Sequence, residues 1–272
     1  MSASANLTRL MEYLSAHAQK GMCVAFSGGV DSSLLLAACA KAGAPLLAVT
    51  IHSPLHSPGE PGEAGAIAAA FGVQHRILTL PKIPENIRYN PPERCYLCKK
   101  ELFGQILGLA GKEGLRSVLD GTNADDLKVY RPGLMALKEL GVLSPLAELG
   151  FSKAQVREMA KEMGLKAADK PSAPCMATRF PYGARLSREG MEKAERIESA
   201  VKALDVEVVR ARIHGDTVRL EAEPESFDKL ITARQELAGL CKSLGFLYVT
   251  MDLEGFRSGS MDIALGKQEG IL

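Results

Sequence analysis

Residues 27–33 read Ser27-Gly28-Gly29-Val30-Asp31-Ser32-Ser33, and they stand between an apolar run typical of a strand and a segment typical of a helix. Two successive glycines let the backbone turn tightly and bring its amide groups against an anion. The helix that follows directs free N–H groups and its positive dipole end at the same point. This stretch therefore predicts a phosphate-binding loop.

The loop does not follow the Walker pattern, because no Gly-Lys-Ser/Thr sequence closes it. The hydroxyls of Ser27, Ser32 and Ser33 would add hydrogen-bond donors around a bound phosphate. The alternative interpretation is an ordinary turn in which Asp31 or Ser32 caps the following helix.

Outward from this loop, the first two-thirds of the chain alternates short β-branched runs with helical stretches. This alternation predicts an α/β fold with a parallel sheet covered by helices. The expected strands cover residues 22–26, 45–51, 75–80 and 116–120, and the expected helices cover residues 31–42, 60–71, 93–111 and 152–164.

The stretch at residues 170–185 contains three prolines and no periodicity, which is typical of an ordered loop at a domain junction. After it the pattern changes to that of a small α+β domain. Its expected elements are a helix at 187–204, strands at 206–213 and 217–222, a helix at 225–244 and a strand at 246–253. We therefore expect two domains, residues 1–182 and residues 183–272.

The composition excludes some classes of partner. The 33 basic and 32 acidic residues leave a net charge of +1, which argues against a surface built for nucleic acid. No apolar run approaches the length of a membrane helix. The N-terminus lacks the basic-then-apolar order of a secretion signal. We expect a cytoplasmic protein without membrane or nucleic-acid partners.

The six cysteines divide into two groups, and in a reducing compartment none is expected to form a disulfide. The first group, in apolar patterns typical of the core, is Cys23, Cys39 and Cys241. In the second group, Cys95 and Cys98 share a face of a predicted helix, and Cys175 lies in the proline-rich loop. A lone CxxC is only half of a zinc site. Three thiol ligands suit a [4Fe–4S] cluster with one open iron; the alternatives are an incidental or buried pair and a packing cysteine.

The loop at residues 27–33 closely resembles the PP-loop of ATP pyrophosphatases, such as asparagine and GMP synthetases and tRNA thiolases. The resemblance implies a doubly wound parallel sheet that binds ATP at the carboxyl ends of its strands. It also implies that ATP is split between its α and β phosphates, with Asp31 among the catalytic residues and the loop holding pyrophosphate.

A second stretch, residues 121–126, matches a turn that lies beside the nucleotide in these enzymes. It reads Gly-Thr-Asn-Ala-Asp-Asp, and we expect Gly121, Asn123 and Asp125 to take part in nucleotide binding. Acidic side chains here would help to hold Mg²⁺ between phosphates. The alternative is a mere Asx-turn that caps a helix.

Further stretches narrow the resemblance to the LarE family. They are Pro-x-Arg-Cys-x-x-Cys-Lys at residues 92–99, Arg-Pro-Gly at 131–133, Gly-Val-Leu-Ser-Pro-Leu at 141–146 and Lys-Pro-Ser-x-x-Cys at 170–175. LarE proteins sulfurate a pyridinium dicarboxylate mononucleotide during synthesis of the nickel-pincer cofactor of lactate racemase. The resemblance covers nearly the whole chain.

This family resemblance implies carboxylate adenylation followed by sulfur transfer. Some LarE proteins have only the cysteine that matches Cys175 and sacrifice its sulfur, whereas others have three cysteines and a [4Fe–4S] cluster. Because Cys95 and Cys98 are also present, the cluster form is favoured. The resemblance also implies a homo-oligomer and a transient contact with the enzyme that inserts nickel.

The predicted strands at 206–213 and 217–222 are joined by His214-Gly215-Asp216. A two-residue turn at Gly215 and Asp216 would place Arg212 opposite Arg219, and Arg210 opposite Glu221, on one sheet face. Opposed arginines repel unless an anion or a carboxylate joins them, and a substrate phosphate is a natural candidate. The alternative is a solvated basic strand face.

The LarE resemblance assigns Arg210 and Arg212 to the substrate phosphate, and we include Glu221 in the same site. Arg179 would serve either this anion or the phosphate of AMP. Three rival functions stay open: a tRNA thiolase with a larger basic surface, an ammonia-dependent ligase that needs no reactive cysteine, and an ATP-binding sensor without chemistry.

Overall fold

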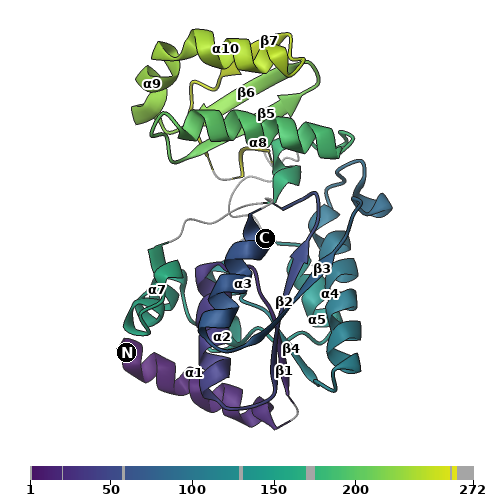
Figure 1. Ribbon diagram of the computed structural model, residues 1–272, viewed down its shortest axis with the longest axis vertical. Coiled ribbons are helices and arrows are strands. Elements are labelled where there is room, and N and C mark those ends of the chain that lie inside the picture. Colours follow the sequence, from purple (N-terminus) through teal and green to yellow (C-terminus); the bar gives the residue numbers. More distant parts are fainter. Residues whose placement is uncertain are drawn as a thin grey trace. The chain divides into compact units, whose positions relative to one another are not determined.

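The computed structural model describes residues 2–19, 21–56, 59–128, 131–169, 175–257 and 259–261. The chain forms two compact units (Figure 1). Unit 1 consists of Met1–Ser53, Pro58–Pro81 and Glu93–Ala173, and unit 2 of Pro54–Ser57, Lys82–Pro92 and Pro174–Leu272. Unit 2 thus includes two short segments from the N-terminal half of the chain. The division at residues 182 and 183 stays a proposal.

Unit 1 is built on a four-stranded sheet with the order β3-β2-β1-β4. Every pair of neighbouring strands is parallel. The strands are β1 (Met22–Ala25), β2 (Leu46–His52), β3 (Gln74–Thr79) and β4 (Ser117–Leu119). The predicted α/β fold with a parallel sheet is confirmed, and each predicted strand overlaps an observed one.

Helices cover both faces of this sheet. Successive side chains of a strand point to opposite faces, so one strand contributes to a core cluster on each side. Met22 and Val24 of β1 pack into one core cluster, and Cys23 packs into the other. The first cluster involves α1 (Ala3–Ala18), α2 (Val30–Lys41), α3 (Glu60–Ala70) and α7 (Lys153–Glu162). The second involves α4 (Arg94–Lys112) and α5 (Gly133–Glu139). Unit 1 is therefore a doubly wound sheet.

Short elements connect the main ones. They are α6 (Pro145–Glu148) and the 3-10 turns η1 (Glu85–Ile87), η2 (Ala124–Lys128), η3 (Lys166–Asp169), η4 (Met176–Arg179) and η5 (Pro224–Ser226). None of the helices in the described ranges is long and apolar enough to cross a membrane.

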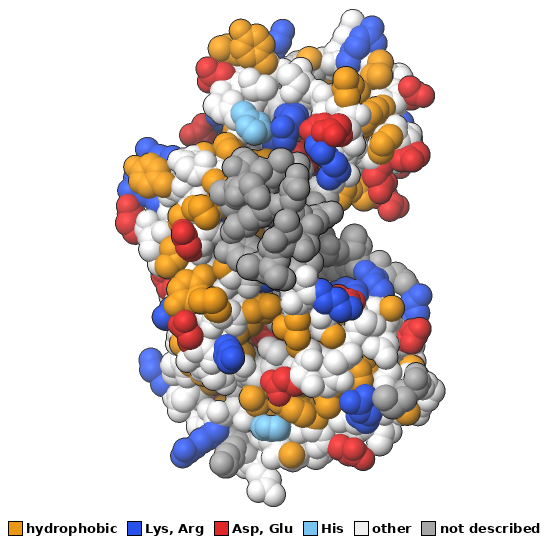
Figure 2. All heavy atoms as spheres, turned by 180° about the vertical axis from the view of Figure 1, so that it is seen from behind, with side chains coloured by type: hydrophobic (Ala, Val, Ile, Leu, Met, Phe, Trp, Pro, Cys, Tyr) orange, Lys and Arg blue, Asp and Glu red, His pale blue; other side chains and the backbone are white. Residues whose placement is uncertain are grey.

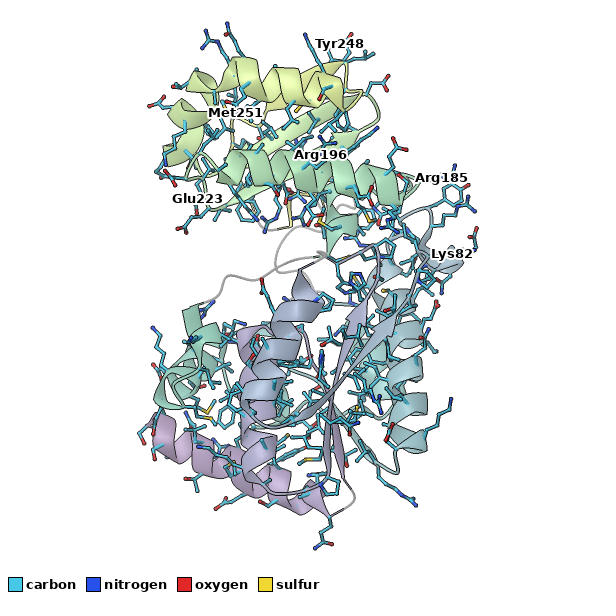
Figure 3. The ribbon with its side chains drawn as sticks, in the orientation of Figure 1. Lys82, Arg185, Arg196, Glu223, Tyr248 and Met251 are labelled. Carbon is cyan, nitrogen blue, oxygen red and sulfur yellow. The ribbon has the colours of Figure 1, made fainter. Side chains whose placement is uncertain are left out.

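Unit 2 contains a three-stranded sheet with the order β5-β6-β7. β5 (Val209–His214) pairs antiparallel with β6 (Thr217–Ala222), and β7 (Tyr248–Met251) runs parallel to β6. Its helices are α8 (Arg188–Lys202), α9 (Phe227–Thr232) and α10 (Arg234–Ser243). Figure 3 labels Arg196 on α8, and Tyr248 and Met251 at the two ends of β7.

The hairpin register is confirmed, but the single helix at residues 225–244 is wrong. His214 pairs with Thr217 and Arg212 with Arg219, as the two-residue turn requires. The expected helix is instead η5, α9 and α10, with α9 ending at Thr232. The Thr232 hydroxyl donates to the carbonyl oxygen of Asp228 at 2.7 Å, and such back-bonding bends and weakens a helix.

Candidate functional site

The stretch at residues 27–33 forms a loop between β1 and α2. Gly28 has φ +72°, a left-handed conformation that favours glycine. Helix α2 begins at Val30 with Gly29 as its N-cap, and no side-chain hydrogen bond caps it. Asp31 and Ser32 lie inside α2, so neither caps it as the alternative interpretation required. No side chain therefore caps the first amides of α2, and uncapped amides at a helix start suit an anion.

The three serines of the loop have different surroundings. The Ser32 hydroxyl donates to the Gly29 carbonyl oxygen at 3.2 Å and accepts from the Ser27 amide at 3.3 Å, so Ser32 shapes the loop. The Ser33 hydroxyl is buried and has no hydrogen-bond partner among the described residues. A buried hydroxyl of this kind usually finds a partner in a bound molecule or water.

The predicted nucleotide turn lies against this loop. Asn123 Nδ2 donates to Asp31 Oδ1 at 3.1 Å. A Cβ atom at Gly121 would lie 3.0 Å from the amide nitrogen of Ser32, so any other residue would require the two segments to move apart by a few tenths of an ångström. The structure therefore brings Asp31, Gly121 and Asn123 together, although they come from distant parts of the chain.

Hydrogen bonds inside the turn keep its acidic side chains in place. Asn123 Oδ1 accepts from the Asp125 amide at 3.0 Å, and Asp126 Oδ2 accepts from the Asn123 amide at 3.0 Å. The Asp125 carboxylate pairs with Lys128 at 2.7 Å and accepts from the Lys153 amide at 2.8 Å. The Lys128 hydrogen bond, and then the Lys153 amide, lower the pKa of Asp125. The turn is thus both an Asx-type turn and a neighbour of the phosphate loop.

Sequence analysis missed Lys153, whose ammonium group pairs with Asp31 Oδ2. Lys153 is the first residue of α7, after the N-cap Ser152, which forms a capping box with Gln155. The cap signal in the sequence marks the start of the helix. No local signal shows that this helix begins beside Asp31.

Asp120 was missed as well. Its carboxylate is buried directly after β4 and accepts from the hydroxyls of Thr122 at 2.5 Å and Ser144 at 2.6 Å. Lys99 Nζ lies 3.9 Å from the same carboxylate. Since Lys99 follows Cys98, this contact links the first turns of α4 to the nucleotide turn.

The first turn of α4, which carries Cys95 and Cys98, is held against α5. A Cβ at Gly133 would lie 3.2 Å from the Cys95 carbonyl oxygen, which shows how closely the helices approach. The Tyr96 hydroxyl donates to Glu139 at 2.8 Å from the same turn. Cys95 is exposed and Cys98 partly exposed.

The other thiols divide as the sequence predicts. Cys23, Cys39 and Cys241 are buried, and burial raises their pKa to about 12, about 12 and about 11. Cys175 is exposed, directly before η4 in unit 2. The predicted cluster ligands therefore belong to both units. Within the described ranges, no three His, Cys, Asp or Glu side chains are grouped to hold a metal ion.

In unit 2, two buried arginines pair with carboxylates. Arg179 forms two hydrogen bonds with Glu198, both of 2.8 Å. Arg212 donates to Glu221 Oε2 at 3.0 and 2.7 Å, and Arg219 donates to Glu221 Oε1 at 2.9 Å. The carboxylate that joins the opposed arginines is therefore Glu221 itself, which is fully buried.

Arg210 is the exception in this group. Its guanidinium donates to the Val209 carbonyl oxygen at 2.7 Å and lies over the Phe256 ring at 5.0 Å. Among the described residues no carboxylate forms an ion pair with it. Burial, and then the positive charge of Arg179, lower the pKa of Arg210. This excess of positive charge makes the position suitable for an anion.

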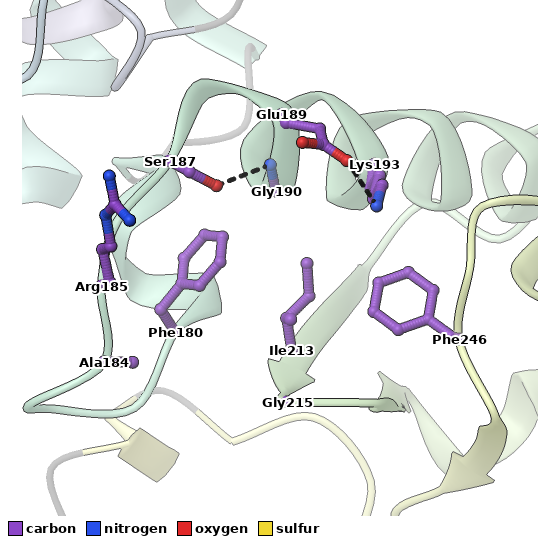
Figure 4. Close-up of a pocket in the computed structure, with 10 residues that line it drawn as sticks. All are labelled: Phe180, Ala184, Arg185, Ser187, Glu189, Gly190, Lys193, Ile213, Gly215 and Phe246. Carbon is purple, nitrogen blue, oxygen red and sulfur yellow. Dashed lines mark hydrogen bonds and ion pairs between the residues drawn. The ribbon is translucent and has the colours of Figure 1, made fainter.

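A cavity of about 390 Å³ lies elsewhere in unit 2 (Figure 4). Its walls include Phe180, Ile213 and Phe246, and Glu189 pairs with Lys193 at its rim at 2.7 Å. None of the predicted site residues lines it. On the face drawn in Figure 2, the described residues place basic and acidic side chains among one another, without a continuous basic surface among them.

Comparisons with known proteins bear on the fold and the family of this chain. The family model described as asparagine synthase matches residues 14–83, which include the phosphate loop. A solved structure, the NMN synthetase of Francisella tularensis, has a TM-score of 0.50 at 16% identity and covers 64% of this chain and 76% of its own. This likeness shows a shared fold.

Two relatives match over nearly their full length. The pyridinium-3,5-bisthiocarboxylic acid mononucleotide synthase of Lactiplantibacillus plantarum is 34% identical over 90% of each chain. An uncharacterized protein of Synechocystis sp. is 40% identical over 90% of this chain and 92% of its own. The tRNA-specific 2-thiouridylase MnmA of Trichlorobacter lovleyi is 30% identical, over 63% of this chain and 58% of its own.

Proposed function

Because this chain belongs to the LarE family of PP-loop ATP pyrophosphatases, we propose that it adenylates a carboxylate of pyridinium-3,5-biscarboxylic acid mononucleotide and converts it to a thiocarboxylate. The observation that carries the proposal is the convergence of the phosphate loop, the turn at residues 121–126 and Lys153 on Asp31. The Asn123 amide and the Lys153 ammonium group hold the Asp31 carboxylate beside the phosphate loop. A carboxylate and a cation at this place suit a nucleotide that binds together with a metal ion.

In the activation step, a substrate carboxylate oxygen attacks the α-phosphorus of ATP and pyrophosphate leaves. The amides at the start of α2 and the serine hydroxyls of the loop would hold the leaving group. Lys153 would balance the charge of Asp31 or of a phosphate. Asp31 and Asp125 would supply the hard oxygen ligands that Mg²⁺ prefers, and the ion would neutralise phosphate charge when bound.

In the transfer step, a sulfur nucleophile attacks the acyl carbon of the mixed anhydride and AMP leaves. If Cys175 gives its own sulfur, the first product is a thioester. Loss of the Cys175 α-proton then breaks the Cβ–Sγ bond, leaving a thiocarboxylate on the substrate and dehydroalanine in the chain. The exposure of Cys175 suits this role.

We also propose a [4Fe–4S] cluster on the three cysteines outside the core, since exposed or partly exposed thiols can ionise and bind iron, whereas burial keeps the other three thiols protonated. Cys95, Cys98 and Cys175 would hold it. An iron without a protein ligand would supply sulfide in place of the cysteine sulfur. Both sources require Cys175.

The arginines of unit 2 are proposed to bind the phosphate of the mononucleotide. Arg210 is available because no described carboxylate pairs with it, and Arg212 offers a guanidinium oriented by Glu221. Arg179 is fixed by Glu198 beside them and adds positive charge. Glu221 thus contributes to the site by orienting arginines.

The L. plantarum synthase, which matches over 90% of each chain, favours a small mononucleotide over tRNA, since the chain spans only 58% of the tRNA thiolase. We also propose a cytoplasmic homo-oligomer that passes its product to the nickel-inserting enzyme, as in the LarE family. The test is to supply ATP and the biscarboxylate mononucleotide and to measure AMP, pyrophosphate and thiocarboxylate. Equal amounts of AMP and pyrophosphate are expected, and formation of ADP with phosphate would refute the proposal.

A further inference from the structure

The backbone that leads into the phosphate loop is held by a buried side chain outside the loop. Phe26 is the last residue before Ser27, and its carbonyl oxygen accepts from the hydroxyl of Thr50 at 2.6 Å. The amide of Phe26 donates to the Val49 carbonyl oxygen at 2.8 Å. Thr50 lies in β2 and is buried. Strand β2 therefore binds both the amide and the carbonyl group of Phe26, the residue directly before the loop.

His75 holds the Thr50 hydroxyl in turn. The two side chains meet at 2.8 Å, between Thr50 Oγ1 and His75 Nε2. A hydroxyl has one proton, and Thr50 gives it to the Phe26 carbonyl, so His75 must be the donor in the second bond. Burial lowers the pKa of His75 and favours its neutral form. The hydrogen-bond network thus assigns the proton of the neutral ring to Nε2.

Helix α3 closes this arrangement from the other side. A Cβ at Gly65 would lie 3.3 Å from His75 Nδ1, so α3 lies close over the ring. The Phe26 ring meets His75 edge-on, with the ring centres 6.3 Å apart. The same helix contacts the loop, since a Cβ at Gly28 would lie 3.6 Å from the Cα of Ala64. Helix α3 therefore packs both against His75, which supports the start of the loop, and against Gly28 within the loop.

We infer that Thr50 and His75 are positioning residues for the phosphate loop, a role that rests on the proposed function. Neither belongs to the loop or to the turn at residues 121–126. They set the direction in which the chain leaves β1, and the aim of the loop amides depends on that direction. Without the Thr50 hydroxyl, the buried Phe26 carbonyl and the partly buried His75 N–H both lose their partner.

The test uses full-length variants in pyrophosphate release and in direct binding of Mg·ATP by calorimetry. Thr50→Val removes the hydroxyl but keeps the shape, and Thr50→Ser keeps the hydroxyl. We expect Thr50→Val to raise the KM and Kd for ATP about tenfold, which corresponds to about 1.4 kcal/mol. Thr50→Ser is expected to stay within about threefold of the parent, and the KM for the mononucleotide is expected not to change.

His75 supplies an independent arm. His75→Gln keeps an N–H donor, and we expect a smaller loss of ATP affinity than with His75→Phe. The matched control is Thr79→Val, at an exposed threonine of β3, which is expected to leave ATP binding unchanged. Circular dichroism without ATP shows which variants fold. If Thr50→Val does not fold, the comparison of His75→Gln with His75→Phe tests the positioning role instead.

The outcomes separate the two proposals. If the parent protein does not bind ATP, the proposed function fails. If the parent binds ATP and Thr50→Val binds it equally well, the positioning role is wrong. Equal losses in Thr50→Val and Thr50→Ser, or a matching loss in Thr79→Val, would also overturn it, because the hydroxyl would then not be the cause.

Discussion

The ammonium group of Lys153 contacts the carboxylate of Asp31, although 122 residues separate the two in sequence. The phosphate loop contains no lysine of its own, unlike a Walker loop. The fold supplies the cation from the first residue of α7, where a capping box fixes the start of the helix. A positive charge is thus placed beside the loop without being part of its motif.

Lys153→Met is expected to reduce kcat/KM for ATP by at least about tenfold, because it removes the charge that balances Asp31 and the phosphates. Lys153→Arg, which keeps the charge, is expected to recover part of this loss. Initial rates of pyrophosphate release provide the measurement. Lys41→Met, at an exposed lysine of α2, is the control. Equal activity of Lys153→Met and the parent would contradict a role for this charge.

Gly121→Ala is expected to weaken ATP binding and to lower stability. The added Cβ would lie 3.0 Å from the Ser32 amide and 3.1 Å from the Asp31 Cβ, so the turn and the loop must shift apart by a few tenths of an ångström. Gly111→Ala in α4 meets nothing within 4 Å and is expected to raise stability by up to about 1 kcal/mol. Chemical denaturation with and without ATP compares the two. An ATP affinity equal to that of the parent in Gly121→Ala would argue against a close turn.

Local sequence patterns predicted the loop, the individual strands of the parallel sheet and the hairpin register, because each of these is formed by residues near one another in the chain. The alternation of β5 and β6 placed Arg212 opposite Arg219 and indicated a need for an anion or carboxylate. Glu221 meets that need from two residues beyond Arg219.

The contacts that sequence analysis missed join distant segments. The Lys153–Asp31 pair and the Lys99–Asp120 contact depend on how helices pack on the sheet. No periodicity or spacing encodes such packing. The prediction of one helix at residues 225–244 failed at Ala233, between α9 and α10, next to the hydrogen bond from the Thr232 hydroxyl to the Asp228 carbonyl oxygen.

Arg210→Gln and Arg212→Gln are expected to have different effects. Arg210 has no carboxylate partner among the described residues, so its loss should raise the KM for the mononucleotide about tenfold with little change in stability. Loss of Arg212 leaves the fully buried Glu221 with one arginine fewer, which should destabilise unit 2 by about 3–5 kcal/mol. Steady-state kinetics and thermal unfolding measure these effects. A stable Arg212→Gln protein would show that the buried pair matters less than its geometry indicates.

Alkylation with iodoacetamide at pH 8 is expected to label Cys95, Cys98 and Cys175 in the native protein purified without a cluster. The pKa values of about 11 to 12 keep Cys23, Cys39 and Cys241 protonated, and burial blocks access to them. All six should react in denaturant, which is the control. Peptide mass spectrometry identifies the labelled thiols, and native labelling of Cys23 would contradict the buried position.

Since folding raises the pKa values of the buried thiols above the ordinary 9.0, the stability that these thiols contribute is intact below about pH 9 and falls as the pH rises towards 12.

The source of sulfur is decided by comparing Cys175→Ser with Cys95→Ser and Cys98→Ser after anaerobic purification. If a cluster delivers sulfide, the parent protein should be brown with about four irons per chain, and each of the three variants should lose iron and turnover. If Cys175 is sacrificed, the parent should be colourless and its Cys175 should lose the mass of H₂S after one turnover. Cys95→Ser and Cys98→Ser should then still complete that turnover, whereas Cys175→Ser should form AMP and pyrophosphate without thiocarboxylate. Thiocarboxylate formation by Cys175→Ser would refute both routes, because each of them requires this thiol.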